Sequence, residues 1–222
     1  MFKNLSKIQN LPITLTEVFS IYLGFWFLLN NLTTDGVWET VFLNVLFFLV
    51  FPIIILKQGL KDQLVLSKIN CKICLQILGV QILVLILVLT INFLPFLKLN
   101  YLSRMDWFLN DWWAIFFIDL VLLPIILVSQ EFFFRNFLIN RLAIILSNKA
   151  VLIVQASLFV GFEILFFEIF NWQFILFNYI LALFLGWFYL QTKSIWYSFF
   201  TRWILILLLD GVILYKIQNI KL

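Results

Sequence analysis

The sequence has no histidine, only two cysteines and few charged residues, which are 12% of the 222 residues. Without histidine, and with Cys71 and Cys74 as the only cysteines, the chain lacks the four ligands of a zinc site. We therefore predict no metal site, and we predict no cofactor. We interpret the CxxC pair as two small apolar residues one helical turn apart, with a redox-active or lipid-modified pair as the alternative.

The shortage of charge accompanies an excess of apolar residues: 64% of the chain is hydrophobic, with 28 Phe and 9 Trp. A soluble domain of this size has too little interior to bury so much apolar surface. Several runs approach the roughly 20 residues of a spanning helix. The sequence predicts an all-α, polytopic transmembrane helical bundle of about seven spans, within a range of six to eight, forming a single domain over residues 1–222. The runs are Leu15–Leu32, Trp38–Leu56, Leu75–Phe96, Trp107–Val128, Ala150–Phe167, Phe174–Leu190 and Ile195–Leu214.

The basic residues fall mainly on alternate loops between these runs. Lys3 and Lys7 precede the first run, and further basic residues lie in Lys57–Lys72, in Arg135–Lys149 and at Lys193. By the positive-inside rule, the N-terminus and the Arg135–Lys149 loop face the cytoplasm of a bacterial inner membrane or an organellar equivalent. The first run is expected to be an uncleaved anchor. The topology of the membrane protein thus accounts for the net charge of +4, and we predict no nucleic acid partner.

Charged side chains inside the apolar runs mark the candidate functional site, because such groups are costly at membrane depth. Glu131 and Arg135 are four residues apart, so on a helix they lie on one face and form an ion pair. Asp119 lies deep in its run and is expected to need a cationic or hydroxyl partner. The buried charges to be matched are Asp119, Glu131 and Glu163 against Arg135 and Arg202.

Three segments, in this order, resemble motifs of the CAAX protease and bacteriocin-processing family (CPBP), also called the ABI or type II CAAX prenyl endopeptidase family. Gln130–Arg135 is similar to the EExxxR motif, and Phe159–Glu163 has the spacing of the FxxxH motif. Gly186–Ile206 is similar to the last motif, in which a glycine precedes a tyrosine, a Thr/Ser-rich turn, Ile-Trp and then HxxxN or HxxxD. The resemblance covers about Gln130–Leu207 and implies the family's helical transmembrane fold.

The family consists of intramembrane glutamic endopeptidases, and the resemblance implies which positions carry the chemistry. The first Glu and the His of FxxxH activate a water, and the last His and Asn stabilise the oxyanion. In this chain the four positions hold Gln130, Glu163, Arg202 and Ile206, whereas the matching positions are Glu131, Arg135 and Phe159. An amide does not act as a general base, and an Ile side chain offers no donor to an oxyanion. We therefore expect the proteolytic activity of the family to be absent.

The leading hypothesis is a catalytically degenerate family member that acts as a membrane partner, assembly or immunity-like factor. It would contact the lipid bilayer and another membrane protein or a hydrophobic peptide. Because the two His positions face each other in the family and here hold an acid and a base, we predict that Glu163 and Arg202 form an ion pair that closes the cavity.

Three other hypotheses remain. In a rewired endopeptidase, Glu163 would be the base, Arg202 the oxyanion donor and Gln130 a positioning group. Against this, a neighbouring Arg202 would keep Glu163 ionised and make it a weak base. A transporter or channel subunit would also use buried charges, although no inverted repeat is evident. In the last hypothesis, the charges are structural pairs in an ordinary bundle.

Overall fold

The computed structural model describes residues 16–25, 27–28, 37–56, 75–77, 79, 82, 117–167 and 172–220. Within these residues every element is a helix, which agrees with the predicted all-α class. The chain divides into two compact units, and each is described by itself. Unit 1 combines Met1–Ser67 with Val128–Ser198, and unit 2 combines Lys68–Leu127 with Phe199–Leu222.

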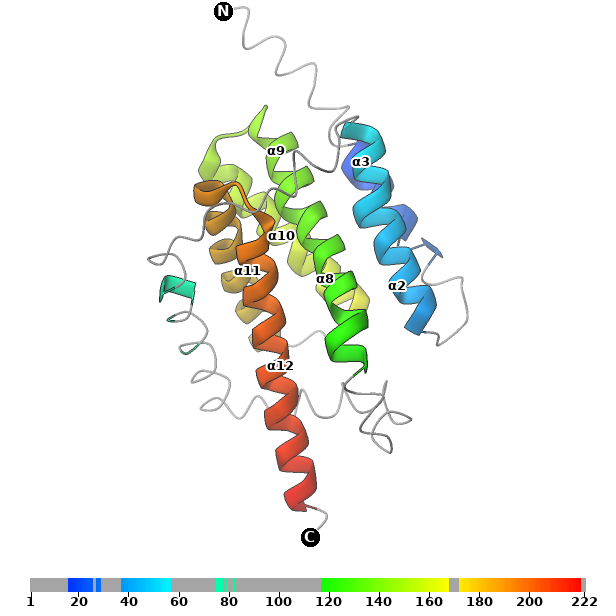
Figure 1. The fold of residues 1–222 in the computed structure, drawn as a ribbon. Coiled ribbons are helices and arrows are strands. Elements are labelled where there is room, and N and C mark those ends of the chain that lie inside the picture. The colour runs from blue at the N-terminus through cyan, green and yellow to red at the C-terminus, as the bar shows by residue number, and fades with distance from the viewer. Residues whose placement is uncertain are drawn as a thin grey trace, which may run out of the picture. The chain divides into compact units, whose positions relative to one another are not determined.

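Figure 1 shows the described helices with their labels. Three of the described segments are π-helical, with a wider turn that is often found at functional sites. The N-terminal helix is described over residues 16–25. It is followed by α2 (Val37–Val45), η1 (Leu46–Val50), α3 (Phe51–Leu56), η2 (Ile118–Leu122), α8 (Leu123–Glu131), η3 (Phe132–Phe137), α9 (Leu138–Ala143), α10 (Asn148–Phe167), α11 (Trp172–Thr192) and α12 (Ile195–Ile220).

Three helical stretches within the described residues are long and apolar enough to cross a membrane: Trp38–Leu56, Asn148–Leu165 and Ile175–Thr192. Their mean hydropathies are 2.4, 1.5 and 1.5, and they correspond to the second, fifth and sixth apolar runs of the sequence. These apolar helices indicate an integral membrane protein. The first, third and fourth runs lie partly or largely outside the described residues, so the total of about seven spans stays a prediction.

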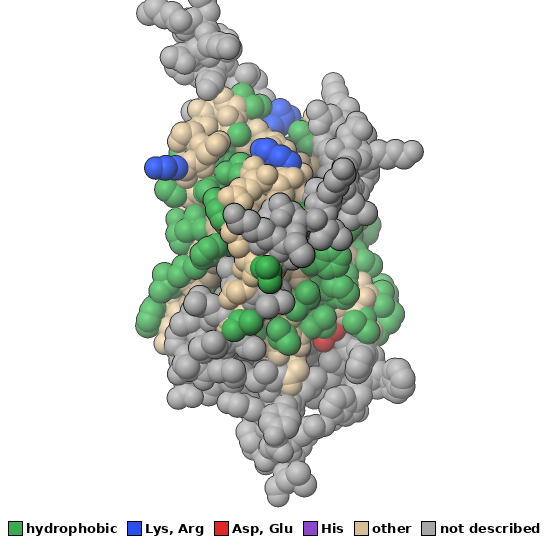
Figure 2. Space-filling model, turned by 60° about the vertical axis from the view of Figure 1, so that its left-hand side comes forward, with side chains coloured by type: hydrophobic (Ala, Val, Ile, Leu, Met, Phe, Trp, Pro, Cys, Tyr) green, Lys and Arg blue, Asp and Glu red, His purple; other side chains and the backbone are tan. Residues whose placement is uncertain are grey.

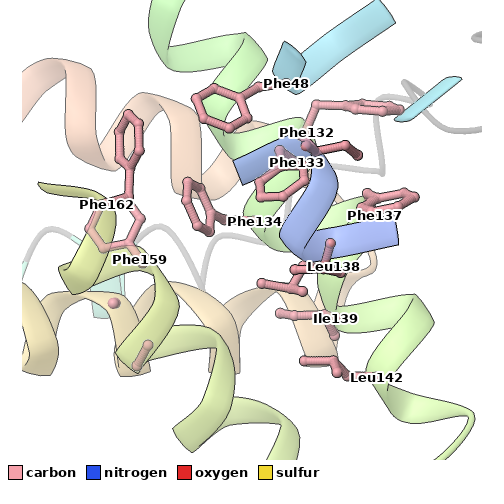
Figure 3. Packing of buried hydrophobic residues seen from close by; sticks show 14 of the residues in the cluster. Phe48, Phe132, Phe133, Phe134, Phe137, Leu138, Ile139, Leu142, Phe159 and Phe162 are labelled. Atoms are coloured by element: carbon pink, nitrogen blue, oxygen red, sulfur yellow. The ribbon is translucent and has the colours of Figure 1, made fainter. Parts of the chain in front are cut away.

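Aromatic rings form the centre of unit 1. All six residues of η3 are buried, and their rings meet rings from η1 and α10 (Figure 3). Phe48 lies 4.9 Å from Phe133, and Phe134 packs edge to face against Phe159 at 5.1 Å, between ring centroids. Edge-to-face pairs are stabilising beyond the apolar area that they bury. This packing holds η3, the segment with Arg135, between η1 and α10.

Large apolar side chains also cover much of the outer surface of the described residues (Figure 2). On α2 and α3 the most exposed are Trp38, Phe42 and Ile54, each more than 60% exposed. In water a surface of this kind would be a liability, whereas in a bilayer it is solvated by lipid chains. The Lys and Arg atoms that are visible lie in the upper part of the view in Figure 2.

Candidate functional site

Glu131 and Arg135 form the buried ion pair that the sequence predicts. Arg135 Nε lies 3.2 Å from Glu131 Oε2, and neither side chain has any exposed surface. Glu131 is the last residue of α8, and Arg135 lies in η3. The guanidinium carbon of Arg135 is also 5.2 Å from the ring centroid of Phe159 on α10, a cation–π distance. Through the contact between Arg135 and the Phe159 ring, the Gln130–Arg135 motif touches the Phe159–Glu163 motif directly.

Gln130 is buried and bonded to a residue that sequence analysis did not single out. Its Nε2 donates a hydrogen bond of 3.1 Å to Oδ1 of Asn44 on α2, and Asn44 Nδ2 donates in turn to the Thr40 carbonyl at 2.9 Å. Asn44 is fully buried. An Asn inside an otherwise apolar run is a signal that could have identified it, since a buried amide needs partners. At the position of the family's first Glu, this chain has an amide that links two helices.

Glu163 lies on α10 one helical turn after Phe159, and its side chain is 4% exposed, as expected for a buried charge. Tyr22, from the N-terminal helix, lies close by. Its hydroxyl is 3.4 Å from the point that a Cβ on Gly161 would occupy, and its ring packs edge to face on Phe162 at 6.3 Å. Tyr22 and Glu163 are close enough to interact electrostatically. After Asn44, Tyr22 is the second residue near the site that the sequence analysis did not identify.

Three polar side chains close a ring of hydrogen bonds between η3, α9 and α11. Tyr189 donates its hydroxyl to Asn136 Oδ1, and Asn140 Nδ2 donates to both Asn136 Oδ1 and the Tyr189 hydroxyl, each at 2.9 Å. Tyr189 is the tyrosine of the last motif. Lys193, at the turn after α11, has φ of 54° and places its ammonium 5.7 Å from the Tyr189 ring centroid. These hydrogen bonds connect Tyr189 of the last motif to Asn136, the residue directly after the first motif.

Arg202 and Ile206 lie on α12 in unit 2, Arg202 buried and Ile206 partly buried. In that unit Trp203 Nε1 donates to the main-chain oxygen of Asp119 at 2.8 Å, and the side chain of Asp119 hydrogen-bonds to that of Asp210. We expected a cationic or hydroxyl partner for Asp119, and this partner is a second carboxyl group. Glu163 belongs to unit 1 and Arg202 to unit 2, and each unit is described by itself. The ion pair between these two residues therefore stays a prediction.

Several expectations from the sequence also stay predictions. The two cysteines, Cys71 and Cys74, lie outside the described residues. The single domain over residues 1–222 and the absence of a metal and a cofactor are not tested by the structure. The expectation of a loop over Arg135–Lys149 is wrong in its first part, because Arg135 is buried in η3 and the chain stays helical to the end of α9. The cytoplasmic position of the connection that follows, between α9 and α10, stays a prediction.

Comparison with known proteins supports the family resemblance. Residues 110–208 match the family model described as Rce1-like, type II CAAX prenyl endopeptidase Rce1-like. The matched segment contains every motif position from Gln130 to Ile206. Comparisons with curated proteins and with solved structures returned no match. The resemblance to type II CAAX prenyl endopeptidases is therefore confirmed over this segment.

Proposed function

We propose that this chain, with its match to the type II CAAX prenyl endopeptidase model over residues 110–208, is a membrane protein that has lost proteolytic activity. It would retain the helical core of the family as a scaffold. The observation that carries this proposal is the hydrogen bond from Gln130 Nε2 to Asn44 Oδ1, at the position where the family has its water-activating Glu.

The geometry around Gln130 favours a structural role. A general base needs a lone pair of suitable basicity within reach of the water, and a carboxamide has none. Asn44 uses its Nδ2 to bond the Thr40 carbonyl, so its oxygen faces Gln130 and accepts from the Gln130 amide nitrogen. The two amides complement each other, and the pair holds α2 against α8.

The preserved half of the first motif supports the role of scaffold. A charge in the middle of a span costs about 2.5–3.5 kcal/mol on insertion scales, and a buried pair persists only with good geometry. In this chain Arg135 keeps both the charge contact with Glu131, at 3.2 Å, and the cation–π contact with Phe159, at 5.2 Å. We propose that the chain acts as a membrane partner, assembly or immunity-like factor toward another membrane protein or a hydrophobic peptide, with the connection between α9 and α10 in the cytoplasm.

Loss of proteolysis is tested with purified protein in micelles and in liposomes. A prenylated CAAX peptide and an unmodified hydrophobic peptide are incubated with the chain and with Glu163→Gln, and products are measured by mass spectrometry. We expect no product from either protein, while an active family member in the same micelles cleaves the CAAX peptide. Product from the unchanged chain that disappears with Glu163→Gln would contradict the proposal.

The partner role is tested by photo-crosslinking from the lipid-facing surface. A photoreactive residue is placed at Phe42 on α2 or at Ile153 on α10, both of which are more than half exposed. We expect one membrane protein, identified by mass spectrometry, to be linked from one of these faces. The link should recur when the photoreactive residue is moved to that protein. Adducts with lipid alone from both positions would argue against a partner.

A rewired endopeptidase is the second candidate, favoured by the surroundings of Glu163. Its carboxyl group is buried in α10, and the Tyr22 hydroxyl is a polar group of the kind that could orient a water or a substrate carbonyl. In this mechanism Glu163 would be the base, Arg202 the oxyanion donor and Gln130 the positioning group. The peptide assay separates the two functions, because only this one requires Glu163 for turnover.

A further inference from the structure

The two long apolar helices of unit 1, α10 and α11, each have a lysine at the same end. The helices follow one another in the chain and pack together where side chains of α10 meet Gly186 of α11. From this contact α10 leads back to Lys149 and α11 leads on to Lys193. The apolar stretches that could cross a membrane, Asn148–Leu165 and Ile175–Thr192, begin and end one residue before these lysines. When the stretches cross a bilayer, both lysines therefore lie at the depth of the lipid headgroups.

A third cation, Arg141 on α9, lies at the same end. Asn140, the residue directly before it, donates a hydrogen bond of 2.9 Å to the Tyr189 hydroxyl, and Lys193 Nζ lies 5.7 Å from the ring centroid of this tyrosine. Lys149 and Lys193 are exposed, and the side chain of Arg141 is 26% exposed. Every other Lys or Arg whose side chain the structure describes is buried. We call Arg141, Lys149 and Lys193 the basic end.

The main chain fixes where Lys193 leaves α11. This residue has φ of 54°, in the left-handed region, and its N–H donates a hydrogen bond of 2.7 Å to the Tyr189 carbonyl. The hydroxyl of Thr192 accepts a hydrogen bond from the N–H of Ser194 at 3.3 Å. Hydrogen bonds of this kind close the C-terminal end of a helix. The ammonium group of Lys193 therefore starts from a defined point just beyond the apolar stretch.

The basic end has an excess of positive charge. Glu17 Oε2 lies 3.3 Å from Arg141 Nη2, and Glu17 is the acidic group beside these cations within the described residues. Three cations and one carboxylate give a net charge of +2 at this end. A zwitterionic headgroup brings its own cation, whereas an anionic headgroup brings a negative charge that the protein can balance.

An exposed apolar face of α11 ends below the basic end. Its members are spaced by four or three residues, so they share one side of the helix, and each is between 38% and 68% exposed. They are Trp172, Leu176, Ile180, Phe184 and Trp187. Tryptophan side chains are typical of the two membrane interfaces, and the residues between them face the acyl chains. A lipid at the basic end would thus have an apolar surface for its chains.

We propose that the basic end is a binding site for the headgroup of an anionic phospholipid. Arg141, Lys149 and Lys193 contact its phosphate group, and its acyl chains lie along the exposed face of α11. The observations that support this site are the position of three cations at one end of unit 1, the single carboxylate beside them and the apolar face below. This inference goes beyond the proposed function and holds whether or not the chain cleaves peptides.

Lipid binding to the full chain in nonionic micelles tests the site. Phosphatidylglycerol and phosphatidylcholine with the same fluorescent acyl chain are titrated with the protein, and binding is measured by fluorescence anisotropy. We expect phosphatidylglycerol to bind at least about fivefold more tightly, which corresponds to the contribution of one basic residue near a charged lipid surface. Equal binding of the two lipids would overturn the proposal.

Two double variants separate charge from side-chain length. Lys149→Gln/Lys193→Gln removes both charges and should reduce the preference for phosphatidylglycerol to less than about twofold. Lys149→Arg/Lys193→Arg keeps both charges and should retain the preference. Thermal unfolding in the same micelles confirms that each variant is folded. A full preference in the Gln variant would contradict the site.

Neutralisation of the neighbouring acid should have the opposite effect. Glu17→Gln removes the negative charge beside Arg141, so we expect it to tighten the binding of phosphatidylglycerol about 2- to 5-fold and to leave phosphatidylcholine unchanged. This variant requires no loss of a basic residue, so it tests the site independently of the lysine variants.

Glu39→Gln is the matched control, because it changes the net charge of the chain by the same amount. Glu39 lies in the first turn of α2, which runs in the same direction as α8, since ring contacts between η1 and η3 follow the bond between Asn44 and Gln130. Glu39 is therefore roughly 20–25 Å from Arg141 along the helix axes. Charges act over about 8 Å at physiological salt, so Glu39→Gln should not alter lipid binding. Equal tightening by Glu17→Gln and Glu39→Gln would show that only the overall charge matters, against a defined site.

A soluble phosphate distinguishes a lipid site from a site for free phosphate groups. Glycerol 3-phosphate has the charged group of the lipid without its acyl chains. In large molar excess it should leave the bound phosphatidylglycerol in place, because the face of α11 holds only the lipid. Displacement of the lipid by glycerol 3-phosphate at equal concentration would assign the three cations to a soluble phosphate and overturn the lipid site.

Discussion

Glu131 and Arg135 form an ion pair of 3.2 Å from which solvent is excluded, one helical turn apart at the junction of α8 and η3. The pair is fully buried, and the Phe159 ring of α10 receives the guanidinium on its face. In such surroundings the two charges neutralise each other, and either one alone would be a charge in a medium of low dielectric constant. The pair therefore gives a sharp test of what stabilises unit 1.

Removal of one charge should be far more harmful than removal of both. Arg135→Leu is expected to destabilise the fold by about 3–5 kcal/mol, because the Glu131 carboxylate loses the cation opposite it. The double variant Glu131→Leu/Arg135→Leu should recover most of this loss. Thermal unfolding in micelles, followed by circular dichroism and by size exclusion, measures the difference. A double variant less stable than Arg135→Leu alone would contradict this account.

The Gln130–Asn44 hydrogen bond should appear as a coupling between two helices that are distant in sequence. Gln130→Leu, Asn44→Leu and the double variant form a thermodynamic cycle whose coupling energy we expect to be about 0.5–1.5 kcal/mol. The stability of each variant is measured by chemical denaturation in mixed micelles. Strictly additive effects would mean that the two amides do not stabilise one another.

The contribution of Tyr189 to the stability of the fold should depend on its hydroxyl group, whereas that of another tyrosine on α11 should not. Tyr189→Phe removes one donor and one acceptor from the ring formed with Asn136 and Asn140, with an expected cost of about 1–3 kcal/mol. Tyr179, partly buried on α11, has no hydrogen bond through its hydroxyl within the described residues, so Tyr179→Phe is the matched control. Both are compared by thermal unfolding. Equal effects would show that the ring contributes no stability.

The sequence revealed those features that depend on residues close together in the chain. Glu131 and Arg135 are four apart, so helical periodicity alone predicted their pairing, and three of the apolar runs predicted helices long enough to span a bilayer. The bond between Gln130 and Asn44 joins residues 86 positions apart, and the one between Tyr189 and Asn136 spans 53 positions. Such partners depend on how helices pack, which no local pattern of residues specifies.

The same limit applies to the residues around Glu163. The position of Glu163 inside an apolar run predicted that it would be buried, and it is. Tyr22 lies in the first apolar run, more than a hundred residues away, and reads in the sequence as one of many aromatic side chains. Its place beside Glu163 depends on how the N-terminal helix packs, and Gly24 allows that helix to approach η1 closely. Small residues at helix contacts have this effect in membranes, but their partners cannot be identified from one sequence.

Gly186 is a third position of close approach, where α11 meets α10. A Cβ there would lie 2.7 Å from Gln155 Oε1 and 2.8 Å from Leu152 Cδ2. Gln155 is fully buried, and its amide makes no hydrogen bond within the part of the chain that the structure describes. A methyl group added at position 186 would therefore meet the ends of both side chains, and both would have to shift.

Gly186→Ala is therefore expected to lower stability by about 1–3 kcal/mol through overpacking. Gly211→Ala on α12 is the matched control, because no atom lies within 4 Å of the added methyl group within the described residues, and alanine favours the helix by up to about 1 kcal/mol. Adding Gln155→Ala to Gly186→Ala should restore part of the stability, since it removes the clash with Gln155 Oε1 and a buried amide without a partner, whereas the contact with Leu152 Cδ2 remains. Unfolding in micelles compares all four proteins. If Gly186→Ala is as stable as Gly211→Ala, then α10 and α11 do not depend on a glycine for their contact.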